Sequence, residues 1–104
     1  MIEEIVLSAL VHNEEYARRV FPFLKGEYFE DPAQRAVFDA YSQTFSKYNQ
    51  IPTKEVISIS VDGMESLNEA VFSNAMTLIG GLELDKKSSV EFLIDETEKF
   101  CRDR

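Results

Sequence analysis

The sequence predicts an all-α fold, a small orthogonal bundle of about five or six helices, and three observations support it. Apolar residues recur at spacings of three and four along most of the chain, which is the helical period. Residues that cap helices, such as Asn13, Asp31 and Thr53, stand in front of these periodic segments. The length of 104 residues, with only three prolines and four glycines, fits one domain over residues 1–104 without a linker.

Two helices are expected near the N-terminus, the first over residues 2–11. Its apolar residues share one face, and Glu3 and Glu4 lie in the first turn, where the helix dipole favours acidic side chains. Asn13 can cap the second helix, which ends or kinks at Pro22 because proline offers no amide hydrogen. The residues expected in or beside the core here are Tyr16, Ala17, Val20, Phe21, Phe23 and Leu24.

The central helix is expected to start after Asp31, an acidic N-cap, with Pro32 in the first turn, where its fixed φ is suitable. Aromatic residues then share one face and polar residues the other, which indicates a core helix with one solvent-exposed side. The aromatic set is Phe38, Tyr41, Phe45 and Tyr48, and the polar set is Arg35, Asp39, Ser42 and Ser46. A stacking platform for nucleic-acid bases is the alternative, but few basic residues accompany the aromatic ones.

Residues 54–61 fit two structures. The alternation of β-branched and serine residues over 57–61 is typical of a strand, whereas Thr53 followed by Lys54 and Glu55 is typical of a helix start. We predict a short helix, because no other segment of the chain offers a strand for pairing.

Two further helices are expected over residues 65–79 and from Ser88 onward. Ser66 with Glu69, and Ser88 with Glu91, have the spacing of a capping box. The first of these helices should bury one face consisting of Leu67, Val71, Asn74, Ala75, Leu78 and Leu82. The inner stripe of the last helix should consist of Val90, Ile94, Thr97 and Cys101, and its outer side should carry the pairs Asp95–Lys99 and Glu98–Arg102.

The last helix carries apolar residues on more than one side. Phe92 is expected to point away from the inner stripe, and Leu93 and Phe100 widen the apolar surface toward one flank. Such a helix needs a second partner beside its own core, either another helix or another subunit, although a lone exposed phenylalanine is the alternative. An oligomer or partner interface is therefore expected at Phe92, Leu93, Glu96, Lys99 and Phe100. Because Arg104 is not followed by a capping residue, we expect the chain to be part of a longer protein.

The charge and the motifs argue against several functions. Nineteen acidic and eleven basic residues give a net charge of −8, which repels phosphate, so weak nucleic-acid binding and a basic protein partner are expected. No glycine begins a phosphate-binding loop of the Walker type, so neither ATP binding nor hydrolysis is expected of this chain. His12 and Cys101 are single residues of their kinds, and no metal, disulfide, catalytic or cofactor site is expected from them. No membrane span or signal peptide is expected, which favours a cytoplasmic location.

Several short segments, in this order, resemble the N-terminal domain of DnaB-family replicative helicases, with the closest likeness to those of tailed bacteriophages. These segments are Ile5-Val6-Leu7-Ser8, Val20-Phe21-Pro22, Glu27-Tyr28-Phe29-Glu30, Phe38, Ile51-Pro52 and Glu96-Thr97-Glu98-Lys99-Phe100. They extend over nearly the whole chain, and none is a catalytic motif. The resemblance implies a helical collar domain that ends in the first helix of a truncated helical hairpin. The core residues expected for it are Ile5, Val6, Leu10, Val20, Phe21, Phe29, Phe38, Tyr41, Phe45, Leu78 and Ile94.

The resemblance also implies a function. Such domains support a hexameric ring and contact primase and helicase loader, while a separate C-terminal domain binds ATP and Mg²⁺ and unwinds duplex DNA. The chain itself would then have no catalytic activity and, if encoded by a phage, would work in the host cytoplasm. Two alternatives stay open: the helicase-binding domain of a primase, against which a start at Met1 argues, and a free-standing acidic α-helical adaptor.

Overall fold

The computed structural model describes all 104 residues and contains six α-helices and two short 3-10 helices, without a strand. In chain order the elements are α1 (Ile2–His12), α2 (Glu14–Val20), η1 (Phe21–Phe23), η2 (Gly26–Tyr28), α3 (Pro32–Tyr48), α4 (Lys54–Asp62), α5 (Glu69–Gly80) and α6 (Val90–Arg102). The all-α fold class is confirmed, and so is the choice of a helix for residues 54–61.

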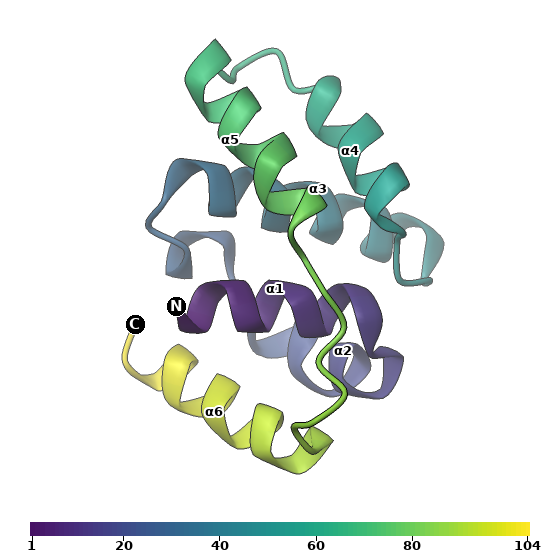
Figure 1. Cartoon of the computed structure of the whole chain (residues 1–104), viewed down its shortest axis with the longest axis vertical. Coiled ribbons are helices and arrows are strands. Elements are labelled where there is room, and N and C mark those ends of the chain that lie inside the picture. Colours follow the sequence, from purple (N-terminus) through teal and green to yellow (C-terminus); the bar gives the residue numbers. More distant parts are fainter.

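The helices form two groups that share one core. Helices α1, α2 and α6 pack against one another, and α3, α4 and α5 form the second group (Figure 1). Helix α6, although last in the chain, therefore lies beside the first two helices. It is reached through the linker of residues 81–89, which runs from α5 past α1 to the start of α6 (Figure 1).

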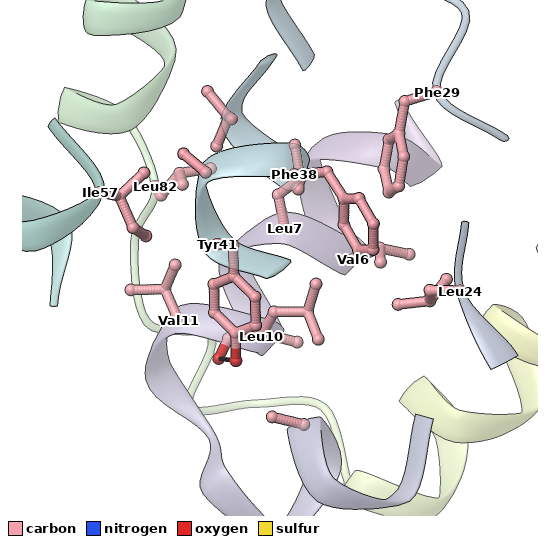
Figure 2. Packing of buried hydrophobic residues seen from close by; sticks show 14 of the residues in the cluster. Val6, Leu7, Leu10, Val11, Leu24, Phe29, Phe38, Tyr41, Ile57 and Leu82 are labelled. Carbon is pink, nitrogen blue, oxygen red and sulfur yellow. Dashed lines mark hydrogen bonds between the residues drawn. The ribbon is translucent and has the colours of Figure 1, made fainter. Parts of the chain in front are cut away.

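The core is a single cluster of 23 buried hydrophobic residues, part of which is shown in Figure 2. Aromatic rings contribute much of it: Phe38 stacks on Phe29 with ring centroids 5.0 Å apart. The Tyr41 hydroxyl is buried as well, and it donates a hydrogen bond of 2.6 Å to the carbonyl oxygen of Leu10, so its burial leaves no polar group unpaired. Of the core residues predicted from the sequence, those found buried are Val6, Leu10, Val20, Phe29, Phe38, Tyr41 and Phe45.

The remaining predicted core residues lie closer to the surface. Ile5 is 42% exposed, because α1 turns Val6 and Leu10 inward and Ile5 stands about 100° away from Val6 on the helix. Leu78 is only partly buried for the same reason, since Ile79 of α5 occupies the inner face. Phe21 and Ile94 are also partly buried and pack against the edge of the cluster.

Two aromatic residues that were expected at the core are exposed. Phe23 lies at the end of the short η1 helix and is 70% exposed, because the turn at Pro22 directs the chain away from the stripe of α2. Tyr48 is exposed in the last turn of α3.

Helices α2, α3 and α4 start at the caps predicted from the sequence, which confirms these predictions. The side chains of Asn13, Asp31 and Thr53 accept hydrogen bonds of 3.0, 3.0 and 3.2 Å from backbone amides in the first turns of α2, α3 and α4. The two predicted capping boxes are wrong. Asn68 caps α5 in place of Ser66, and Ser89 caps α6 in place of Ser88, each by accepting from the amide three residues ahead.

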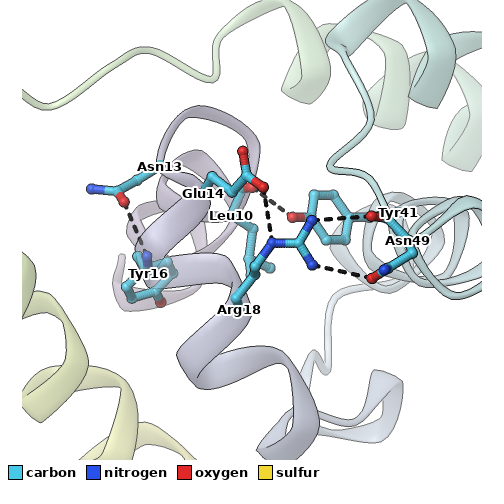
Figure 3. Close-up of polar contacts among 7 residues, drawn as sticks. All are labelled: Leu10, Asn13, Glu14, Tyr16, Arg18, Tyr41 and Asn49. Carbon is cyan, nitrogen blue, oxygen red and sulfur yellow. Dashed lines mark hydrogen bonds and ion pairs between the residues drawn. The ribbon is translucent and has the colours of Figure 1, made fainter.

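A polar contact ties α2 to the end of α3 (Figure 3). Asn49 ends α3 in the left-handed conformation, with a φ of 53°, which asparagine tolerates better than most residues. The Arg18 guanidinium donates to the side-chain oxygen of Asn49 at 3.1 Å and to its carbonyl oxygen at 3.0 Å. Glu14 accepts a third hydrogen bond of 2.8 Å from Arg18 and so orients the guanidinium.

Candidate interaction surface

The inner side of α6 differs from the predicted stripe. Leu93, Thr97 and Phe100 are buried, whereas Val90, Ile94 and Cys101 are only partly buried. All six residues belong to one wide apolar arc, and the helix packs against the core along the edge of this arc that carries Leu93 and Phe100. The expectation that Leu93 and Phe100 lie on a free surface is therefore wrong.

The other three residues of the predicted interface lie on the outer side of α6. Phe92 is 54% exposed and has no place in the core. Glu96 and Lys99 form an ion pair with each other at 3.2 Å. Lys99 thus pairs with Glu96 and not with Asp95, while the predicted pair between Glu98 and Arg102 is present at 3.3 Å.

A buried hydrogen bond fixes α6 against α2. The hydroxyl of Tyr16 meets Oγ1 of Thr97, which itself donates to the carbonyl oxygen of Leu93 at 2.7 Å. Because the single proton of Thr97 is used in that second bond, Tyr16 is the donor in the first. Burial raises the pKa of Tyr16 to about 12, so the hydroxyl keeps its proton over the physiological range.

The last turn of α6 is held from several sides. The Phe100 ring packs on Phe29 and Tyr28 with centroids 5.4 and 6.3 Å away. Arg104 covers the same ring at 4.5 Å and donates to the carbonyl oxygen of Tyr28 at 3.0 Å and to Glu3 at 2.8 Å. Phe100 is thus enclosed within this chain.

A groove lies between α2, η1 and α6, with a volume of about 540 Å³. We call it the α2–α6 groove, and its lining consists of Arg19, Val20, Phe23, Tyr28, Ile94, Thr97, Glu98, Cys101 and Arg102. The exposed side chain of Phe23 lies at one wall of this groove. Cys101 lines it as well, and desolvation raises the pKa of its thiol, which favours the neutral form.

Both arginines of the α2–α6 groove have acidic partners. Arg19 lies 3.0 Å from Glu91, and Arg102 lies 3.3 Å from Glu98. The groove therefore combines apolar walls with a charge-balanced rim, which is the usual character of a protein contact surface. The sequence signal for it was Phe23 itself, an aromatic residue directly after Pro22 that continues no helical stripe.

The two residues weighed for chemistry have structural surroundings. His12 ends α1, and its Nε2 atom lies 2.8 Å from the carbonyl oxygen of Leu82. No group of three or more histidine, cysteine or acidic side chains lies close enough to hold a metal ion. None of the helices has the length and apolar character needed to cross a membrane.

Comparison with known proteins gives two matches. Residues 1–71, from α1 to the start of α5, match the model of the family described as DnaB-like helicase N terminal domain. Over 101 residues, which are 97% of the chain, the sequence is 29% identical to the DnaB-like replicative helicase of Enterobacteria phage T4. The matched part is 21% of that relative, so the chain spans about a fifth of its length.

Proposed function

Because the chain belongs to the family of DnaB-like helicase N-terminal domains, we propose that it is the assembly and partner-docking domain of a replicative DNA helicase. The family match over residues 1–71 is the observation that carries this proposal, and it confirms the resemblance expected from the sequence. The similarity to a replicative helicase continues through α6, since it includes 97% of the chain.

The proposal divides the work of the protein between two parts. Residues 1–104 support a hexameric ring and receive a primase or a helicase loader. ATP binding with Mg²⁺, ATP hydrolysis and duplex unwinding belong to a further part of the protein, as a relative about five times as long allows. The assembly would act at a replication fork in the cytoplasm of the host cell.

The surface of the chain is compatible with contacts to proteins. Phe23 and Phe92 are large exposed aromatic residues, and aromatic side chains are enriched at the centres of protein interfaces. The α2–α6 groove adds an apolar hollow beside Phe23. With Leu93 and Phe100 enclosed in the core, Phe23, Phe92 and the α2–α6 groove are the positions that we assign to assembly.

The net charge supports the same division. At −8, the domain repels the phosphate backbone, so contact with DNA is assigned to the other part of the protein. A ring-forming domain needs only complementary protein surfaces. Apolar patches, and patches in which acidic and basic side chains balance, are of this kind.

The test compares the full-length gene product with a variant that lacks residues 1–104. We expect sedimentation to show closed rings for the full-length protein and fewer or less stable rings for the variant, together with loss of binding to the purified primase of the same genome. ATP turnover by the variant is the control that its remaining part is folded. A gene that ends at Arg104, or a folded variant that assembles and binds primase like the full-length protein, would overturn the proposal.

A further inference from the structure

A second hollow lies between α1 and the linker of residues 81–89, with a volume of about 440 Å³. We call it the α1–linker cleft. Its apolar lining includes Ile5 and Ala9 of α1, Leu78 of α5, Leu84 of the linker and Leu93 of α6. Three helices and the linker that joins two of them therefore meet at this cleft, which is distinct from the α2–α6 groove.

One end of the linker is bonded to α1, and its other end is ordered by hydrogen bonds within the linker itself. At one end, Leu82 is buried and its carbonyl oxygen is bonded to His12 at the end of α1. At the other end, Oδ1 of Asp85 accepts hydrogen bonds of 2.8 and 3.1 Å from the backbone amides of Lys87 and Ser88. The cleft is thus formed in the free chain, which reduces the entropy that a ligand must overcome on binding.

Apolar side chains in the α1–linker cleft remain open to water. Ile5 is 42% exposed and Leu84 is 48% exposed, although both are large and apolar. Neither residue lines the α2–α6 groove. Burial of such surface by a partner is favourable by about 25 cal/mol for each Å² removed from water.

The rim of the α1–linker cleft is acidic. Glu4, Glu83 and Asp85 line it, and no lysine or arginine does. None of these three carboxylates has a lysine or arginine partner among the ion pairs of the chain. The terminal ammonium of Met1, which also lines the cleft, is paired with Glu3 at 3.1 Å.

From this combination we infer that the α1–linker cleft binds an amphipathic helix of a basic partner protein. Its apolar side chains would cover Ile5 and Leu84, and its lysine or arginine side chains would face the acidic rim. A second copy of the chain is a poorer occupant, because an acidic rim attracts a basic helix more strongly than a surface of a chain whose net charge is −8. The inference rests on the docking role proposed above and specifies one place and one kind of partner for it.

The first test uses the 104-residue chain and three synthetic helical peptides in calorimetric titration. The probe has leucines on one face and lysines on the other. In the first control peptide glutamates replace the lysines, and in the second serines replace the leucines. We expect binding of the probe alone, because the cleft needs both complementary charge and apolar contact. Absence of binding by the probe, or equal binding of either control peptide, would overturn the inference.

The second test locates the binding site with two matched double variants. Glu83→Lys with Leu84→Ser alters the cleft, whereas Glu55→Lys with Ile59→Ser makes the same changes on α4, where Ile59 is 73% exposed. We expect the cleft variant to weaken probe binding by at least about tenfold and the α4 variant by less than about twofold. Circular dichroism checks that both variants remain helical.

Three results of this second test would overturn the inference. Equal weakening of probe binding in the two variants would show that only the overall charge of the chain attracts the peptide. Unchanged binding by the cleft variant would place the peptide elsewhere. Loss of self-association by the cleft variant, with peptide binding intact, would make a second copy the occupant. A failure of the proposed function would be seen in the deletion experiment instead, where the protein without residues 1–104 would still form rings and bind primase.

Discussion

Tyr16 and Thr97 share a buried hydrogen bond across 81 residues of sequence, and this bond joins the inner side of α6 to α2. Leu93, Thr97 and Phe100 lie on the same side of the apolar arc of α6, and all three side chains are buried. The rotation of α6 in turn decides which aromatic residues are enclosed and which remain on the surface. Phe100 is enclosed, and Phe92 is left outside.

The first prediction concerns the two partners of this bond. Tyr16→Phe removes the donor but leaves Thr97 bonded to the carbonyl oxygen of Leu93, so we expect a loss of about 1 kcal/mol in the free energy of unfolding. Thr97→Val leaves the buried Tyr16 hydroxyl without a partner, and the expected loss is larger, about 1 to 3 kcal/mol. Urea denaturation measures both. A larger loss for Tyr16→Phe than for Thr97→Val would contradict this assignment of donor and acceptor.

The second prediction concerns alkaline pH. Desolvation raises the pKa of Tyr16 to about 12 and that of Tyr41 above its usual value as well. A pKa that is higher in the folded than in the unfolded state adds stability below the unfolded value, near 10, and this contribution disappears as the pH rises through the folded value. We expect the free energy of unfolding to fall between about pH 10 and pH 12. The fall should be smaller in Tyr16→Phe, and denaturation at several pH values checks this.

The third prediction concerns the aromatic core. Phe38 is buried and stacks on Phe29, so Phe38→Ala should lower the free energy of unfolding by about 3 to 5 kcal/mol. Chemical denaturation measures the change, with Tyr48→Ala on the exposed end of the same helix as the control. A loss below about 1 kcal/mol for Phe38→Ala, the size seen for surface substitutions, would contradict its place in the core.

Helix caps could be predicted from the sequence where they depend only on neighbouring residues. Asn13, Asp31 and Thr53 are predicted as caps because each stands before a periodic segment, and in the structure each accepts a hydrogen bond from the amide three residues ahead. Where two capping residues stand close together, as at Ser88 and Ser89, the pattern selected the wrong one. Both choices satisfy the same local rule, and the packing of the helix decides between them.

The orientation of α6 could not be predicted from its own residues. Its apolar arc includes Val90, Leu93, Ile94, Thr97, Phe100 and Cys101, and several rotations of the helix would bury part of this arc. The long-range bond from Tyr16 to Thr97 and the rings around Phe100 select one of them. The α1–linker cleft was missed for a related reason, because it exists only where α1 and residues 81–89 meet in space.

The fourth prediction concerns nucleotides and DNA. We expect the 104-residue chain to show no ATP turnover and only weak binding of single-stranded DNA at physiological salt, since its charge of −8 opposes contact with phosphate. Nucleotide turnover and calorimetric titration measure the two properties. Micromolar DNA binding that persists at raised salt would contradict the expectation, because such binding could not come from release of counterions.

The last prediction concerns self-association through exposed aromatic residues. Phe23 and Phe92 are 70% and 54% exposed, and a contact made by such a small surface should be weak and dependent on concentration. Phe23→Ser with Phe92→Ser should lower self-association in sedimentation experiments and change the melting temperature little, because neither side chain belongs to the core. Tyr48→Ser, at an exposed position on α3, is the matched control and should behave like the parent chain.

Phe100→Ser separates an effect on assembly from an effect on folding. Phe100 is buried among Phe29, Tyr28 and Arg104, so this change should lower the free energy of unfolding by at least about 3 kcal/mol, the usual cost of truncating a buried phenylalanine. Loss of association in Phe100→Ser alone would therefore reflect unfolding of α6. If the double variant of Phe23 and Phe92 associates like the parent chain at every concentration, these two aromatic side chains have no part in assembly. The contact between subunits would then lie on another face of the domain.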